Sequence, residues 1–150
     1  MIFETRNRLE FYSRLTTLKI IVSVILVTGG YGGGHFKSAQ IYFPQSGRFC
    51  SLPDMKEGIN LHTQDGSLIC GGYPTGQSCS EWKSDSGTWN SYNLPRTRKY
   101  SESWTPQSGV GTYLTGDEST HRATTDLIKP DGTVQQGFNL KYDTRFNAAF

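Results

Sequence analysis

Short runs of apolar residues, each followed by glycine, recur along the chain. They are ILVTGG (residues 25–30), LICGG (residues 68–72) and TYLTGD (residues 112–117). The first glycines of these runs, Gly29, Gly71 and Gly116, are 42 and then 45 residues apart. Apolar runs this short, bounded by turn residues, are typical of buried strands, whereas helices need about ten or more periodic residues. The pattern therefore predicts strands that end at a glycine at regular intervals.

A second series of turns keeps nearly the same interval. Its glycines, Gly47, Gly87 and Gly132, are 40 and then 45 residues apart. Large side chains flank the first two of these turns on both sides: Tyr42 with Phe49, and Trp82 with Trp89. Val134 takes the place of the second aromatic residue after the third turn. Two series of turns with a common interval indicate a tandem repeat of about 40–45 residues.

The second copy shows how one unit is built. Four pieces of strand-like sequence, INLHT, SLICG, CSEW and TWNSYN, are separated by turn sequences. Such a unit is a small antiparallel sheet, and it cannot bury both of its apolar faces alone. We predict an all-β protein in which such sheets stack on one another. The repeats are expected over residues 20–58, 59–100 and 101–150, after a leader formed by residues 1–19.

The doubled glycines have a physical explanation in such a stack. Gly29-Gly30 and Gly71-Gly72 follow the apolar strands, where neighbouring sheets approach most closely. A residue without a Cβ lets backbone pack on backbone, or adopts a positive φ to leave the strand. The aromatic residues beside the turns are then expected to fill the space between sheets, each contributing roughly 1.5–3 kcal/mol on burial.

The N-terminal apolar stretch, residues 18–27, has two interpretations. It follows Arg6, Arg8 and Arg14, as the core of a signal peptide would, and it is shorter than the about 20 residues that span a bilayer. Cleavage would then fall near residues 28–30. The alternative is a buried strand, which we favour because VILVTGG has the same form as SLICGG.

Composition agrees with the predicted strands and turns. Seventeen Gly, eight Tyr, eight Phe and three Trp occur beside only 19% charged residues. A chain so poor in Glu and Lys does not favour long helices. The net charge is +2, and the basic residues form no stripe, so we expect no nucleic-acid partner.

The three cysteines leave the redox compartment open. Cys70 and Cys79 lie on either side of GGYPTGQS, so their side chains would meet if that segment is the loop of a hairpin. A disulfide there favours an extracellular location and would contribute about 2–3 kcal/mol. The alternative is three reduced cysteines, with Cys50 as the third, packed as small apolar residues.

The order of these features resembles the kelch repeat, the four-stranded blade of a β-propeller. The second copy, LICGG…EW…SGTW…LPRTR, reproduces the kelch order of diglycine, aromatic residue, turn, Trp and basic residue. The third copy departs from it, with Gly116-Asp117 in place of a diglycine and Val134 in place of Trp. Closed propellers have about four to eight blades. The resemblance therefore implies an incomplete propeller of about three blades. We favour a fragment of a larger protein; the alternative is association with copies of itself.

Function follows from the same resemblance, which implies protein–protein binding through loops. The candidate binding residues are Tyr31, His35, Lys37, Tyr73, His121 and Arg122. Alternatives are part of a galactose-oxidase-like enzyme, whose relatives carry a copper site of Tyr and His, or an extracellular sugar-binding propeller. The three histidines do not cluster with Tyr at ligand spacing, and His62 is expected to be structural. We expect no catalytic residue, no metal and no cofactor.

Overall fold

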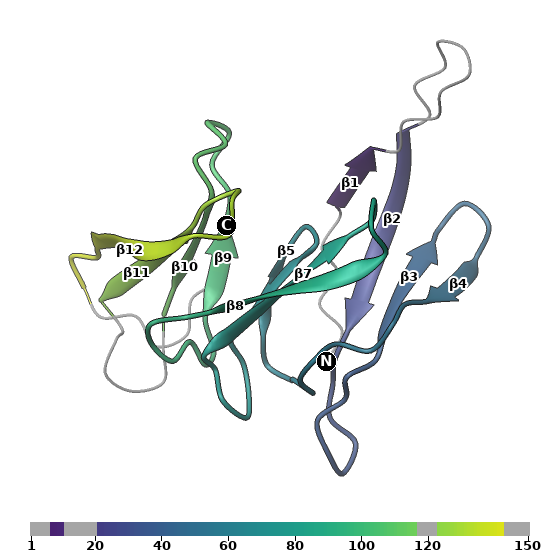
Figure 1. The fold of residues 1–150 in the computed structure, drawn as a ribbon, viewed down its shortest axis with the longest axis horizontal. Helices are drawn as coiled ribbons and strands as arrows, with labels where there is room; N and C mark the ends of the chain where they lie inside the picture. Colours follow the sequence, from purple (N-terminus) through teal and green to yellow (C-terminus); the bar gives the residue numbers. More distant parts are fainter. Residues whose placement is uncertain (1–6, 11–20, 117–122, 143–150) are drawn as a thin grey trace.

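The fold is all-β, as the sequence predicts (Figure 1). The computed structural model describes residues 7–10, 21–116 and 123–142. Their twelve strands form three antiparallel four-stranded sheets, in each of which the strands lie in chain order. None of these described sheets closes on itself. The described part of the chain also contains no apolar helix of the length that crossing a bilayer requires.

The three sheets stand side by side, in the order in which they occur along the chain (Figure 1). Sheet 1 consists of β1 (Asn7–Glu10), β2 (Ile21–Thr28), β3 (Ala39–Phe43) and β4 (Arg48–Ser51). Sheet 2 consists of β5 (Thr63–Asp65), β6 (Leu68–Cys70), β7 (Ser78–Lys83) and β8 (Thr88–Asn93). Sheet 3 consists of β9 (Glu102–Trp104), β10 (Thr112–Thr115), β11 (Thr124–Ile128) and β12 (Val134–Asn139).

The N-terminal region differs from the sequence prediction. The apolar run supplies β2, the second strand of sheet 1, as the strand interpretation predicts. The first strand is β1, which lies within the predicted leader and pairs with β2 from Asn7↔Val24 to Glu10↔Ile21. The segment NRLE has no apolar alternation, so its pairing with β2 was not apparent from the local sequence.

One register position is equivalent in all three sheets. It is a pair of residues that flanks the turn between the last two strands: Tyr42 with Phe49, Trp82 with Trp89, and Ile128 with Val134. The two aromatic pairs are in contact, with ring centroids 4.7 and 5.3 Å apart. Val134 therefore occupies the position that aromatic residues hold in sheets 1 and 2.

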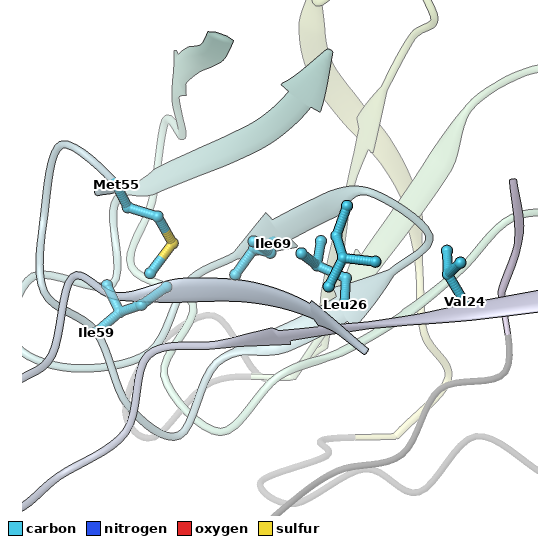
Figure 2. Packing of buried hydrophobic residues seen from close by; sticks show 6 residues of the cluster. Val24, Leu26, Met55, Ile59 and Ile69 are labelled. Atoms are coloured by element: carbon cyan, nitrogen blue, oxygen red, sulfur yellow. The ribbon is translucent and has the colours of Figure 1, made fainter. Parts of the chain in front are cut away.

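An apolar core joins sheets 1 and 2 (Figure 2). Its buried members are Val24, Leu26, Ile41, Met55, Ile59 and Ile69. All but Ile69 come from sheet 1 or the segment that leaves it, and the side chain of Trp89 packs against the cluster from β8. In sheets 2 and 3 we call the face toward the preceding sheet the front face, and the opposite face the back face. In sheet 1 the back face is the one that packs on sheet 2, and the front face is the opposite one. Burial of each such side chain contributes roughly 1.5–3 kcal/mol.

A second core joins sheets 2 and 3. Its buried residues are Leu68, Cys70, Cys79, Leu94, Leu114 and Ile128. Cys70 and Cys79 face each other on paired strands and form a disulfide, as one of the two interpretations of the cysteines predicts. Cys50 is a free, exposed thiol.

Polar contacts link the edges of neighbouring sheets. The Thr28 hydroxyl at the end of β2 lies 3.1 Å from His62 Nε2 and donates to Gln64 Oε1 of β5. Between sheets 2 and 3 the first strands, β5 and β9, lie against each other, and the Thr63 and Ser103 hydroxyls are 2.7 Å apart. Hydrogen bonds between side chains therefore join each sheet to the next beside the apolar cores.

Candidate functional site

The loops that follow the glycine doublets lie at one end of the stacked sheets, together with the segments that cross from one sheet to the next. Gly30 N–H donates to the Ile59 carbonyl at 2.8 Å, and Gly72 N–H donates to the Arg98 carbonyl at 2.9 Å. Ile59 and Arg98 lie in the segments that lead to sheets 2 and 3. The first glycines have φ values of +63° and +70°, and a Cβ on either would overlap the same two carbonyls. Each doublet therefore holds the crossing chain by backbone contact.

These hydrogen bonds make Ile59 and Arg98 equivalent positions in consecutive repeats. Two residues beyond each lies a non-glycine residue in the left-handed region, Leu61 with φ +52° and Tyr100 with φ +54°. This conformation is unfavourable for large side chains, and residues held in it cluster at functional sites. The repeat thus places a strained bulky residue at the same end of sheets 2 and 3.

The connection between β2 and β3 projects beyond the end of these strands (Figure 1). Tyr31 is 67% exposed and Phe36 46% exposed in this loop. Tyr31 forms a β-bridge with His35, and their rings are 5.5 Å apart in an edge-on arrangement. His35 Nδ1 lies 3.0 Å from Asn60 Oδ1, which connects the loop to the segment that enters sheet 2.

Asn60 also holds the next loop. Its backbone forms two hydrogen bonds with the backbone of Tyr73, of 2.8 and 3.2 Å. The Tyr73 ring lies edge-on to Tyr100 at 5.7 Å, and Lys99 Nζ lies 4.4 Å from its centroid, a cation–π contact. The structure thus connects two loops that are about 40 residues apart in sequence. We call this set the glycine-end surface: Tyr31, His35, Phe36, Tyr73, Lys99 and Tyr100.

Four of the predicted binding residues lie in these loops. Tyr31, His35 and Tyr73 belong to the glycine-end surface, and Lys37 is exposed in the same loop as His35. His121 and Arg122 lie outside the described residues. Sequence reasoning missed Phe36, Lys99 and Tyr100. Lys99 and Tyr100 directly follow Arg98, the basic residue at the end of the second copy, and this position in the repeat could have identified them.

A cleft of about 310 Å³ lies at the opposite end, between sheets 2 and 3. Two carboxylates line it, and both already accept hydrogen bonds. Asp65 accepts from the Thr105 hydroxyl at 2.6 Å, and Glu81 accepts from Lys83 at 2.7 Å and from the Tyr92 hydroxyl at 2.5 Å. Burial, together with the bond to Glu81, raises the pKa of Tyr92. Both carboxylates of the cleft thus have hydrogen-bond partners within the protein.

His62 has a structural environment. Besides its contact with Thr28, its Cα and Cβ lie against the position that a Cβ on Gly72 would occupy. Burial lowers the pKa of His62 to about 4, so the ring is neutral near pH 7. Within the described ranges, no group of three His, Cys, Asp or Glu side chains is arranged to hold a metal ion.

No protein-family model matches the chain, and no curated protein matches it by sequence.

Proposed function

We propose that the chain is a kelch-type interaction module that binds a protein partner through the glycine-end surface. The observation that carries the proposal is the convergence of two successive loops on Asn60. They present Tyr31, Phe36 and Tyr73 on a framework fixed by backbone hydrogen bonds, and Lys99 lies against the Tyr73 ring. Tyr and other aromatic residues are the side chains that dominate protein–protein contacts.

The kelch assignment of this proposal is supported by two features. Each of the first two sheets places a glycine doublet directly after its second strand, and each doublet binds the chain that leads to the next sheet. The aromatic pairs beside the later turns share one register, Tyr42 with Phe49 and Trp82 with Trp89. In this proposal the three sheets are three blades of a propeller, and a rigid stack presents the loops.

Loss of binding in surface variants tests the proposed function. The chain is immobilised and used to capture proteins from an extract, alongside a Tyr31→Ala/Phe36→Ala variant and a Val110→Ala control. Val110 is exposed in the β9–β10 loop at the opposite end of the stack. We expect at least one protein to bind the parent and the Val110 variant alike, and to bind the double variant at least tenfold more weakly.

Two results would count against this function. One is that no captured protein distinguishes the double variant from the control. The other is that the double variant captures proteins as the parent does but loses a different activity. That activity would be copper binding with oxidase activity, or binding on a glycan array.

A further inference from the structure

The two outermost faces of the stack correspond in strand register to the two kinds of face that meet between the sheets within the chain. The front face of sheet 1 and the back face of sheet 3 have no neighbouring sheet among the described residues. The residues on these two faces can be compared with those at the internal interfaces, because strand pairing fixes which residues of each sheet are equivalent. Directly paired residues share a face, and successive residues alternate between faces.

The front face of sheet 1 matches the front faces of sheets 2 and 3. In sheet 2 the pair Trp82–Trp89 lies on the front face, and Trp89 packs against the core shared with sheet 1. In sheet 3 the equivalent pair packs on sheet 2. In sheet 1 this position is held by Tyr42 and Phe49, and Phe49 is 61% exposed.

The back face of sheet 3 corresponds in register to the back faces of sheets 1 and 2, and it carries aromatic side chains where theirs carry Leu. Leu26 in sheet 1 and Leu68 in sheet 2 face the following sheet, and Tyr113 occupies the equivalent place in sheet 3. Tyr113 stacks on Trp104 at 5.0 Å and contacts Phe138 at 5.3 Å. Phe138 remains 47% exposed, so this aromatic cluster is an apolar face with no described sheet against it.

We propose that a second copy of this chain covers these faces, front face of sheet 1 against back face of sheet 3. The argument is continuity with the two interfaces inside the chain, which join a front face with a back face through the same register positions. A head-to-tail contact of this kind uses two different surfaces and closes when the rotation allows it. Two copies then form a ring of six sheets with two identical contacts, within the range of closed sheet stacks.

The experiment is sedimentation equilibrium of the full chain and of two face variants. Exposed Cys50 is alkylated beforehand, which excludes pairs held by a disulfide. Phe49→Asp alters only the front face of sheet 1, and Phe138→Lys alters only the back face of sheet 3. Both side chains are exposed, and the far-ultraviolet circular dichroism spectrum verifies that each variant keeps its strands.

We expect the parent at twice 16.8 kDa and each variant alone at 16.8 kDa. An equimolar mixture of the two variants regains the paired mass, because one contact then joins two unaltered faces and the other sets Asp against Lys. Tyr31→Asp, on the glycine-end surface, keeps the paired mass. This control separates the association from the proposed partner binding.

Several outcomes would overturn the inference. They are a parent that sediments as a single copy, a Phe49→Asp variant that still pairs alone, a mixture that stays at the single-copy mass, and a mass that rises beyond the pair with concentration. The second result would indicate a contact between two identical faces, and the last an open chain of copies.

Discussion

The interface between sheets 1 and 2 and the interface between sheets 2 and 3 share one backbone arrangement and differ in chemistry. In both, the second glycine of a doublet binds the carbonyl of the crossing segment, at Ile59 or at Arg98. Ile59 packs in an apolar core. Arg98 is completely buried and its Nε lies 2.7 Å from the buried Asp126 of β11. The repeat thus fixes the backbone, while the side chain at the same position is free to be apolar or ionic.

The ionic interface depends on several contacts at once. Besides Asp126, Arg98 donates to the carbonyls of Gly116 and Thr124, at 3.2 and 3.0 Å. Arg96 lies 3.3 Å from the second Asp126 oxygen and donates to Gln136. A buried ion pair contributes little net stability compared with apolar packing, but removal of one partner leaves a buried charge uncompensated. The two interfaces should therefore respond very differently to single substitutions.

The largest effect is expected from Arg98→Met. Asp126 then stays buried with only Arg96 near it, and the free energy of unfolding should fall by about 3–5 kcal/mol. Urea unfolding followed by tryptophan fluorescence measures the change. The double variant Arg98→Met/Asp126→Leu gives this interface the apolar character of its neighbour and should regain most of the loss. A single variant within about 1 kcal/mol of the parent would contradict the role of the ion pair.

Acid should weaken the other interface, through His62. Its pKa is about 4 in the folded chain and 6.5 in the unfolded chain. The unfolded chain therefore binds a proton at higher pH than the folded chain, and stability falls as the pH decreases from 6.5 to 4. The loss approaches roughly 3 kcal/mol at pH 4.

The pH effect is measured as the difference in unfolding free energy between pH 7 and pH 4.5. His62→Gln should remove most of the His62 contribution, whereas His35→Gln, which alters an exposed side chain, should retain it. Equal pH dependence in the parent and in His62→Gln would show that protonation of His62 is not what destabilises the folded chain in acid.

The disulfide marks another difference between the sheets. At the register position of Cys70 and Cys79, sheet 1 has Thr28 and Ala39, which are not covalently joined. Cys70→Thr/Cys79→Ala transfers the sheet 1 pair to sheet 2 and should reduce stability by about 2–3 kcal/mol, because the short loop is no longer closed in the unfolded chain. Reductant should lower the stability of the parent by a similar amount and leave the variant unchanged. A parent that is insensitive to reductant would contradict this.

The sequence predicts those parts of the fold that local chemistry specifies. Glycine turns mark the last hairpin of all three sheets, and aromatic pairs mark that hairpin in sheets 1 and 2. The spacing of Cys70 and Cys79 about a hairpin loop favours the disulfide that the structure contains. The sequence does not predict β1, because pairing with β2, and not its own apolar pattern, holds it in the sheet.

Contacts between distant residues could not be predicted in this way. The sequence shows Arg98 only as the basic residue at the end of the second copy, since its partner Asp126 lies 28 residues further on, in sheet 3. His62 was expected to be structural, but its contact with Thr28 across the sheet boundary has no local sequence signal. The glycine-end surface is another case, because Asn60 joins its two loops only after the sheets have stacked.

The smallest effect is expected from Ile59→Val, the apolar counterpart of the Arg98 substitution. It removes one methylene from the sheet 1–2 core and should cost about 0.5–1.5 kcal/mol, measured as a lower urea midpoint with an unchanged slope. The Ile59 carbonyl still accepts the Gly30 N–H, so the backbone link is the same before and after the change. Val110→Ala, in an exposed loop, should stay within about 0.5 kcal/mol of the parent. If Ile59→Val cost as much as Arg98→Met, side-chain chemistry would not distinguish the two interfaces, and the difference between them would have to lie in the backbone.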